Sequence, residues 1–224
     1  MKKIELHCHS IDASPCSTES AESIVDIYVK AGYDAILLTN HYARCVYEIY
    51  GCKSIDEYVD IFMRAVEKVK KAAEGKIQVL VGAELRFDGS VNDYLWFGFD
   101  EEFLRKTPDL FEMGIAKFHE ICQEKGWLVV QAHPFRNGMM VINPAYLDGV
   151  EVYNGHVGHD SRNFIARNWA EEYGLIKTSG TDLHYAHVPA TGGILTDEKV
   201  ENVTDLIGVL KSGKYTLLTT DLVK

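Results

Sequence analysis

Short apolar runs alternate along the chain with longer segments in which apolar residues recur every three or four positions. The first pattern is typical of buried strands and the second of amphipathic helices. The strand-like runs cover residues 3–6, 35–39, 77–81, 128–130, 150–152, 175–177 and 194–195. This alternation predicts an α/β fold, with a parallel sheet and crossover helices that is either closed as a barrel or left open.

Two predicted helices have clear boundaries. The first places Ala21, Ile24, Val25 and Tyr28 on one face and ends at Gly32. The second begins with a capping box formed by Ser54 and Glu57 and ends at Gly75. Its expected core face consists of Ile55, Tyr58, Val59, Phe62, Val66 and Val69.

Three further helices are predicted in the second half of the chain. Thr107 and Pro108 resemble an N-cap followed by a first-turn proline, and predict a helix that runs through Phe118 and Ile121 to Gly126. The other two helices have expected buried faces formed by Phe164, Ile165 and Trp169, and by Val203, Leu206, Ile207 and Leu210.

Composition narrows the class of protein. A chain of 224 residues with 46% hydrophobic residues fits one globular domain over residues 1–224. No apolar run reaches the length of a membrane span and no signal-peptide pattern is present, so we expect a cytoplasmic protein with no membrane partner. The five cysteines lack CxxC spacing and are expected to be reduced. A net charge of −10 makes nucleic acid an unlikely partner.

Histidines follow several of the strand-like runs. Of nine histidines, five come directly after such a run or a few residues beyond it: His7, His9, His41, His133 and His184. The carboxyl ends of parallel strands converge on one rim, so residues far apart in the sequence would meet there. This placement predicts a functional site at that rim.

The residue types at these strand ends are those of a metal site. His7 and His9 are two positions apart, so an extended chain points both imidazoles to the same side and leaves Cys8 in the core. Imidazole nitrogen binds zinc, iron and manganese, and an open catalytic site also needs oxygen ligands. Glu84 and Asp182 each follow a strand and could supply these oxygens.

Each element also has a structural interpretation. A histidine pair is common, His133 could be a turn residue bonded to the backbone, and Asp182 could cap a helix. Glu84 could form a salt bridge at the edge of the core. The joint pattern is less easily explained in structural terms and favours a metal site.

The set of motifs resembles the polymerase and histidinol phosphatase (PHP) family of metal-dependent phosphoesterases. The resemblance extends from Glu5 to about Gly193. The matching segments are residues 5–10 (ELHCHS), 38–41 (LTNH), 82–84 (GAE), 132–136 (AHPFR), 149–154 (GVEVYN) and 179–184 (SGTDLH). The resemblance implies a distorted (β/α)7 barrel of the TIM type, with seven parallel strands and two or three divalent metal ions (Zn, Mn or Fe).

The resemblance also implies a ligand set. One metal ion would be held by His7, His9, Glu84 and Asp182. Glu84 would bridge to a second ion bound by His133, and a third would be held by His41 and His184. Glu151 and Asn154 match a family motif and are expected to hydrogen-bond to ligands rather than to bind metal.

The chain departs from the family pattern at three positions. The first motif usually supplies a further histidine or aspartate after the second histidine, and here only Asp12 lies near that place. Asp93 stands in a segment where many members have a histidine, and is expected to substitute as an oxygen ligand. Asn40 replaces the aspartate that usually precedes His41. The third metal site is therefore the one that these departures affect most.

The implied activity is hydrolysis of a small phosphate monoester, similar to histidinol phosphate or to a nucleotide or sugar phosphate, by a metal-activated water. The residues expected to act in catalysis are Glu84, Asp182 and His184, and those expected to bind the phosphate are Arg136 and Arg44. Two alternatives remain: a metal-binding domain of this type without catalysis, and a metal-dependent amidohydrolase. The oligomeric state is not predicted.

Overall fold

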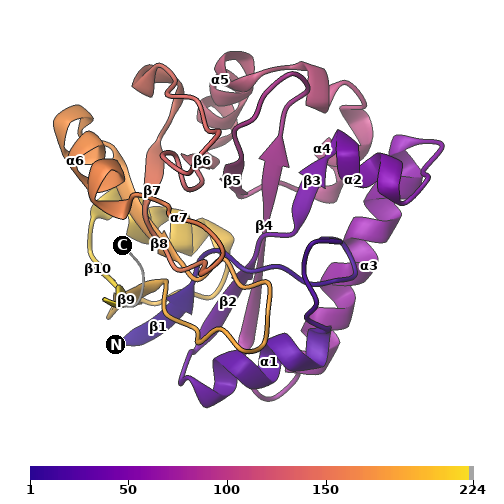
Figure 1. The fold of residues 1–224 in the computed structure, drawn as a ribbon. Coiled ribbons are helices and arrows are strands. Elements are labelled where there is room, and N and C mark those ends of the chain that lie inside the picture. The colour runs from indigo at the N-terminus through magenta and orange to yellow at the C-terminus, as the bar shows by residue number, and fades with distance from the viewer. Residues whose placement is uncertain (222–224) are drawn as a thin grey trace.

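The computed structural model describes residues 1–221 and places the strands at the centre with helices around them (Figure 1). The last three residues of the predicted domain lie outside this range. The strands are β1 (Lys2–Glu5), β2 (Ala35–Leu38), β3 (His41–Ala43), β4 (Gln78–Arg86), β5 (Tyr94–Phe97), β6 (Leu128–Gln131), β7 (Gly149–Asn154), β8 (Ile176–Gly180), β9 (Ile194–Thr196) and β10 (Thr216–Leu217).

These strands form one curved sheet in the order β10-β9-β1-β2-β4-β5-β6-β7-β8, with β3 paired to β4. The pairs β1–β2, β2–β4, β3–β4, β6–β7 and β7–β8 are parallel. A bridge between Cys8 and Leu183 joins the ends of the segments that follow β1 and β8. The sheet therefore curls into a nearly closed barrel, and the predicted α/β barrel class is confirmed.

The barrel differs in detail from seven parallel strands. β5 runs antiparallel to both β4 and β6, and β9 runs antiparallel to β1. Residues 87–93 join β4 to β5 without a helix. A parallel pair needs a crossover of a dozen or more residues, so this short connection reverses the chain direction.

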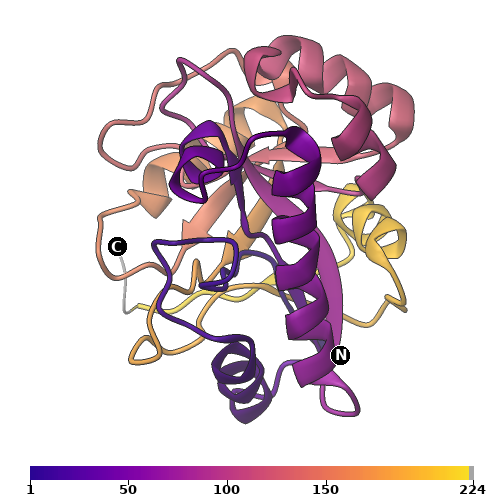
Figure 2. The same cartoon turned by 90° about the vertical axis from the view of Figure 1, so that its right-hand side faces the viewer.

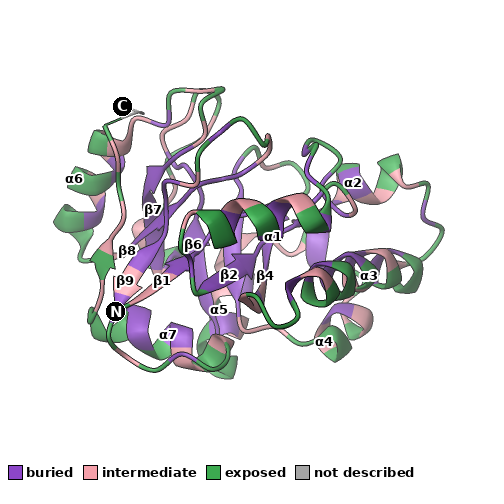
Figure 3. Ribbon diagram, turned by 90° about the horizontal axis from the view of Figure 1, so that it is seen from below, coloured by how far each residue is buried: buried purple, intermediate pink, exposed green. Residues whose placement is uncertain are grey.

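Helices cover the outside of the sheet. They are α1 (Ala21–Lys30), α2 (Arg44–Ile49), α3 (Ile55–Ala73), α4 (Glu101–Lys106), α5 (Ile115–Lys125), α6 (Asn163–Tyr173) and α7 (Val203–Ser212), with short 3-10 helices η1 (Leu110–Glu112) and η2 (Pro144–Tyr146). α3 contacts both α1 and β4, and it runs from top to bottom across the face turned toward the viewer in Figure 2. Figure 3 shows exposed residues on the outer faces of the helices and buried residues along the strands.

The two helices with clear boundaries in the sequence form as predicted. All four residues of the expected α1 face are buried, and the Ser20 side chain caps the helix by accepting a bond from the Ser23 backbone N–H. In α3, Ser54 caps the Glu57 N–H, while the Glu57 carboxylate accepts from the N–H of Lys53 rather than from Ser54. Of the six predicted α3 core residues, only Ile55 is half-buried rather than buried.

Two helix predictions were wrong in part. α5 begins at Ile115, after Gly114 with its positive φ of 74°, because residues 110–112 form a separate 3-10 turn. In α6 the buried residues are Ala166 and Ala170, whereas Phe164 is 64% exposed. The small alanine side chains allow the α6 backbone to lie close to β7. Phe164 points outward, whereas Ile165 and Trp169 are half-buried and Trp169 packs against the larger apolar cluster.

Alternate positions of the strands face two different apolar clusters. In β2, Ile36 and Leu38 belong to the larger cluster, which includes the buried faces of α1 and α3. Ala35 and Leu37 belong to a second cluster that includes Leu206 and other residues of α7. Apolar side chains thus cover both faces of the sheet, as expected for strands whose sequences are continuous apolar runs. Within residues 1–221 we find no helix whose length and apolar character would let it cross a lipid bilayer.

Candidate metal centre

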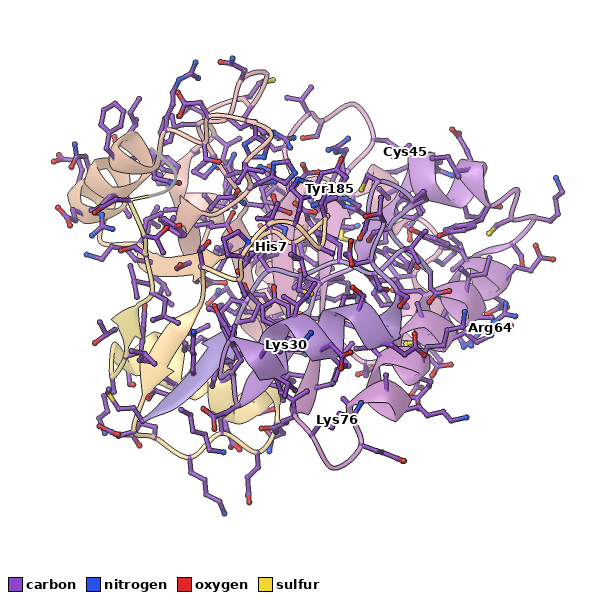
Figure 4. All side chains as sticks on the ribbon, turned by 60° about the horizontal axis from the view of Figure 1, so that its bottom comes forward. His7, Lys30, Cys45, Arg64, Lys76 and Tyr185 are labelled. Carbon is purple, nitrogen blue, oxygen red and sulfur yellow. The ribbon has the colours of Figure 1, made fainter. Side chains whose placement is uncertain are left out.

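The segments that follow the parallel strands bring the predicted histidines and carboxylates together. His7 and His9 follow β1, His133 follows β6 and Asp182 follows β8. His41 lies in β3 and pairs in register with Glu84 of β4. Next to them is a cavity of about 360 Å³ whose lining includes Glu84, His133 and Asp182. In the view of Figure 4, His7 lies near the middle of the molecule.

His7, His9 and Asp182 form the most compact group of donor atoms. The Nε2 atoms of His7 and His9 are 3.0 Å apart, and each lies 3.3 Å from Oδ1 of Asp182. Three ligands bound tetrahedrally to one ion at about 2 Å would be about 3.3 Å from one another. This group therefore fits one metal ion.

Glu84 lies between this group and two other histidines. Its Oε1 atom is 3.1 Å from His133 Nε2 and 3.5 Å from His7 Nε2. Its Oε2 atom is 2.9 Å from His41 Nδ1 and 3.4 Å from His9 Nε2. One carboxylate thus faces four imidazoles, which is the position a bridging ligand requires.

Three groups of donor atoms within residues 1–221 are close enough to hold an ion. They are His7, His9 and Asp182; His7, Glu84 and His133; and His9, His41 and His184. All seven residues were singled out in the sequence. The first two groups lie in the buried interior, and the third includes His41 and His184, whose side chains are 19% and 11% exposed.

Glu151 and Asn154 of β7 hold these side chains in place. Glu151 Oε1 is 2.8 Å from His7 Nδ1, and its Oε2 accepts a bond from the His133 backbone N–H. The Asn154 amide donates to Glu151 Oε2 and to Asp182 Oδ2. A carboxylate on the second ring nitrogen fixes the orientation of a ligating histidine, so both residues have the supporting positions expected from the sequence.

The backbone of Gly180 lies very close to the side chains of His7 and Glu151. A Cβ atom at this position would collide with His7 and with the Glu151 carboxylate. His133 and Asp182 are themselves in the left-handed region, with φ of 31° and 53°. Such conformations are unfavourable for residues other than glycine and cluster at functional sites.

The pKa values of His7 and Glu84 show that negative charge is concentrated among these buried side chains. Burial would lower the pKa of His7, but the carboxylates of Asp182, Glu151 and Glu84 hold it well above its ordinary value. Burial would likewise raise the pKa of Glu84, whereas His41 and His7 keep it well below its ordinary value. The buried carboxylates therefore need cations beside them.

One buried atom shows that protein groups do not complete this site. Asp182 is 3% exposed, and its Oδ1 atom has no hydrogen-bond partner although it faces imidazole nitrogens. An unsatisfied buried carboxylate oxygen costs free energy unless a cation or donor compensates it. A divalent ion among these donors would do so, and the residues fit such an ion.

Asp93 has a different environment from the one expected of an oxygen ligand. Its carboxylate accepts two bonds from Arg86, at 2.6 and 2.8 Å, and one from Arg136 at 3.3 Å. His133 Nε2 is 3.9 Å from Asp93 Oδ2. Both oxygens accept hydrogen bonds from guanidinium groups, and Asp93 belongs to none of the three groups of donor atoms described above.

Two other predicted residues do not reach the cavity. Arg44 was expected to bind phosphate, but its guanidinium pairs with Asp88 and Glu112 and does not line the cavity. Asp12 pairs with Lys68 on α3. In both cases an oppositely charged surface partner holds the side chain away from the site. Arg136 does line the cavity.

The structure also places Cys16, Arg86 and Tyr185 in the lining of the cavity, which the sequence did not single out. His156 and His159, two loop histidines that the sequence places near the rim as candidate proton donors to a leaving group, line it as well. The Cys16 Sγ atom is 3.1 Å from His41 Nε2 and 3.2 Å from His184 Nε2. Burial would raise the pKa of Cys16, but hydrogen bonds with His184 and His41 outweigh this and lower it to about 6. No spacing rule distinguished Cys16 from Asp12 in the sequence.

Comparison with known protein families gives a match over nearly the whole chain. The model of the PHP domain family matches residues 5–215. No curated protein matches the chain.

Solved structures share the fold at low sequence identity. PsfC from Pseudomonas syringae is 16% identical with a TM-score of 0.70, over 98% of this chain and 92% of that one. A two-domain protein from Bacteroides vulgatus, which contains a predicted PHP-like metal-dependent phosphoesterase, is 16% identical with a TM-score of 0.68. The match covers 97% of this chain and 64% of that protein, so the chain spans about two thirds of its length.

A third structure is the lesion-specific endonuclease EndoQ from Pyrococcus furiosus. It is 11% identical with a TM-score of 0.64, and the match covers 96% of this chain and 57% of that one. At these identities the comparisons show a shared fold.

Proposed function

Since the chain belongs to the PHP domain family, we propose that it is a metal-dependent phosphoesterase that hydrolyses a small phosphate monoester. The observation that carries the proposal is the position of Glu84, whose two carboxylate oxygens face His7, His9, His41 and His133. A carboxylate placed in this way can join neighbouring ions into one centre. Two or three divalent ions (Zn, Mn or Fe) would fit the donor groups.

Seven residues would hold the ions. His7, His9 and Asp182 form the first group, His133 joins Glu84 in the second, and His41 and His184 belong to the third. When bound, divalent ions neutralise phosphate oxygens and lower the pKa of water toward about 7. Glu84, Asp182 and His184 are the residues whose loss would disturb the reacting centre most directly.

The arginine side of the cavity would bind and orient the substrate. Arg136 is 27% exposed and lines the cavity, and its bond to Asp93 is long, at 3.3 Å. A planar guanidinium can bind two phosphate oxygens at once. Arg86 lines the same cavity but is held by two short bonds to Asp93, so Arg136 is the better placed of the two to bind a phosphate oxygen.

The size and charge of the molecule favour a small substrate. A cavity of about 360 Å³ is at the lower end of the range for small-molecule sites. The net charge of −10 would repel a nucleic acid backbone. The likeness to an endonuclease makes an oligonucleotide the substrate to test against this preference.

Two other functions make different predictions from the same site. A metal-dependent amidohydrolase would have similar ligands but would cleave an amide rather than a phosphate ester. A domain that binds metal without catalysis would have no turnover at all. Several buried polar groups clustered at one cavity are costly to keep, which supports catalysis over the second alternative.

The test is hydrolysis of a generic aryl phosphate by the purified protein, with metal content measured on the same sample. Activity would be measured again after chelation and after addition of manganese or zinc. We expect turnover that requires metal, with two or three ions per chain. Metal without turnover would favour an amide substrate or a non-catalytic domain, and a protein that binds no metal under any loading would refute the proposal.

A further inference from the structure

Cys16 lies between His41 and His184, two histidines of the third donor group. The loop that contains it follows His9, and its Sγ atom is 3.1 Å from His41 Nε2 and 3.2 Å from His184 Nε2. The side chain is solvent-exposed on one side and lines the cavity. The Cys16 sulfur therefore contacts one nitrogen of each of the two imidazole rings.

In each of the two histidines, the hydrogen-bond partner of Nδ1 indicates which ring nitrogen has the proton. His184 Nδ1 is 3.1 Å from the backbone carbonyl oxygen of Asp182, which can only accept a hydrogen bond. His41 Nδ1 is 2.9 Å from the Glu84 carboxylate, which also accepts. In both rings Nδ1 carries the proton, so in the neutral ring the lone pair is on Nε2 and faces Cys16.

While both rings are neutral, a thiol cannot satisfy this arrangement. Cys16 has one S–H proton, while two Nε2 lone pairs lie within 3.2 Å of its sulfur. One hydrogen bond would leave the other lone pair facing sulfur. A histidine whose second nitrogen is bonded to a carbonyl or carboxylate is the usual form of a metal-ligating histidine. A cation among the three atoms would use all three electron pairs.

We propose that Cys16 is a thiolate ligand of a metal ion held together with Nε2 of His41 and His184. The resulting site has two nitrogen ligands and one sulfur ligand, and the soft sulfur selects zinc or cobalt over manganese or magnesium. This inference rests on the proposed metal centre and specifies the composition of its third site. Cys16 then fills the place for which the sequence offered only Asp12.

The two sulfur–nitrogen distances are close to those around a bound ion. With Zn–S at about 2.3 Å and Zn–N at about 2.0 Å, a tetrahedral site separates sulfur from nitrogen by about 3.5 Å. The two distances observed here are 3.1 and 3.2 Å, a few tenths of an ångström shorter. Three protein ligands would leave one position open toward the cavity, as in catalytic zinc sites.

Cys45 provides a matched control. It is also exposed and lines the same cavity, but within residues 1–221 its sulfur forms no hydrogen bond with a histidine nitrogen. A property that both cysteines share reflects exposure, whereas a property of Cys16 alone reflects its histidine neighbours.

The first experiment uses cobalt as the probe. The metal-free full-length protein is reconstituted with Co²⁺, and the near-ultraviolet charge-transfer band of a thiolate–cobalt bond is recorded with the metal content. We expect the band in the wild type and in Cys45→Ser. Cys16→Ser should lose the band and bind about one ion fewer per chain. Cobalt bound without the band, or a band that persists in Cys16→Ser, overturns the role of Cys16. Absence of cobalt binding overturns the metal centre itself.

A second measurement on the wild type does not depend on the folding of a variant. Iodoacetamide labelling of Cys16 and Cys45 is followed by mass spectrometry with and without zinc. Free zinc at about ten times its Kd leaves only about a tenth of the Cys16 thiolate free, so its labelling slows about tenfold. Cys45 should be labelled at the same rate in both conditions. Equal labelling of Cys16 with and without zinc contradicts ligation.

Discussion

Two buried aspartates on one cavity have opposite surroundings. Asp93 is 2% exposed and accepts three hydrogen bonds from Arg86 and Arg136. Asp182 is 3% exposed, and its Oδ1 atom faces the Nε2 atoms of His7 and His9 at 3.3 Å without a hydrogen bond. The first lies on the arginine side of the cavity and the second on the histidine side.

The difference follows from the chemistry of the neighbours. A guanidinium stays charged at any ordinary pH, so Asp93 is neutralised by the protein alone. An imidazole is neutral near physiological pH unless its pKa is raised, and its free nitrogen then repels a carboxylate oxygen. Asp182 needs either protonated histidines or a metal ion. The same residue type is thus a structural anchor on one side and a ligand candidate on the other.

Glu84→Gln should have the largest effect. The amide keeps the shape of the side chain but loses the charge that faces His7, His9, His41 and His133. Residues that only support ligands typically change affinity or activity by about 10- to 100-fold, so removal of a bridging ligand should exceed about 100-fold. The measurement is kcat with metal content, and circular dichroism checks that the fold is retained. Normal turnover with normal metal content would rule out the bridging role.

The paired variants Asp182→Asn and Asp93→Asn test the comparison itself. Asp182→Asn should lower metal affinity by at least about tenfold, with little change in the stability of the metal-free protein. Asp93→Asn leaves two arginines beside an uncharged amide. Because both arginines are partly exposed, the loss of stability should fall between that of an exposed pair, about 0–1 kcal/mol, and that of a broken buried pair, about 3–5 kcal/mol, at about 2 kcal/mol.

Two measurements separate these outcomes: the metal content of each variant as purified, and urea unfolding of each variant after its metal has been removed. We expect Asp93→Asn to keep its metal and to unfold at a lower urea concentration than the wild type. Asp182→Asn should lose metal and unfold at about the same urea concentration as the wild type. The comparison would fail if both variants lost metal equally, because Asp93 would then contribute to the donor groups.

Arg136→Ala should weaken substrate binding without affecting the metal ions. A hydrogen bond to a charged group contributes about 1.5–3 kcal/mol, so the KM for an aryl phosphate should rise about tenfold or more. Metal content should match that of the wild type. An unchanged KM would show that the Arg136 guanidinium only neutralises Asp93.

Arg44→Ala should have the smallest effect. Arg44 is bound to Asp88 and Glu112 at the surface, and such pairs contribute about 0–1 kcal/mol to stability. We expect kcat/KM to stay within about twofold of the wild type, since an exposed pair outside the cavity contributes little to binding. A tenfold loss of kcat/KM would show that the side chain reaches the substrate after all.

Local patterns in the sequence were sufficient for much of the fold. The α1 face was predicted completely because its apolar residues recur with the helical period and a serine caps its start. The α6 face was predicted one position out of register, because the apolar bulk of Phe164 was a stronger signal than the small Ala166 and Ala170. Side-chain size at a helix–sheet contact depends on how closely the backbones approach, and periodicity contains no such information.

For the site, the sequence by itself determined which strand ends have histidines and carboxylates, since the carboxyl ends of parallel strands converge on one rim. Only the tertiary structure decided which residue completes the third donor group. Asp12 and Cys16 belong to the same loop, but Lys68 on α3 holds Asp12 at the surface while His41 and His184 surround the Cys16 sulfur. These partners are 25 to 168 positions away in the chain, so no local spacing could have identified them.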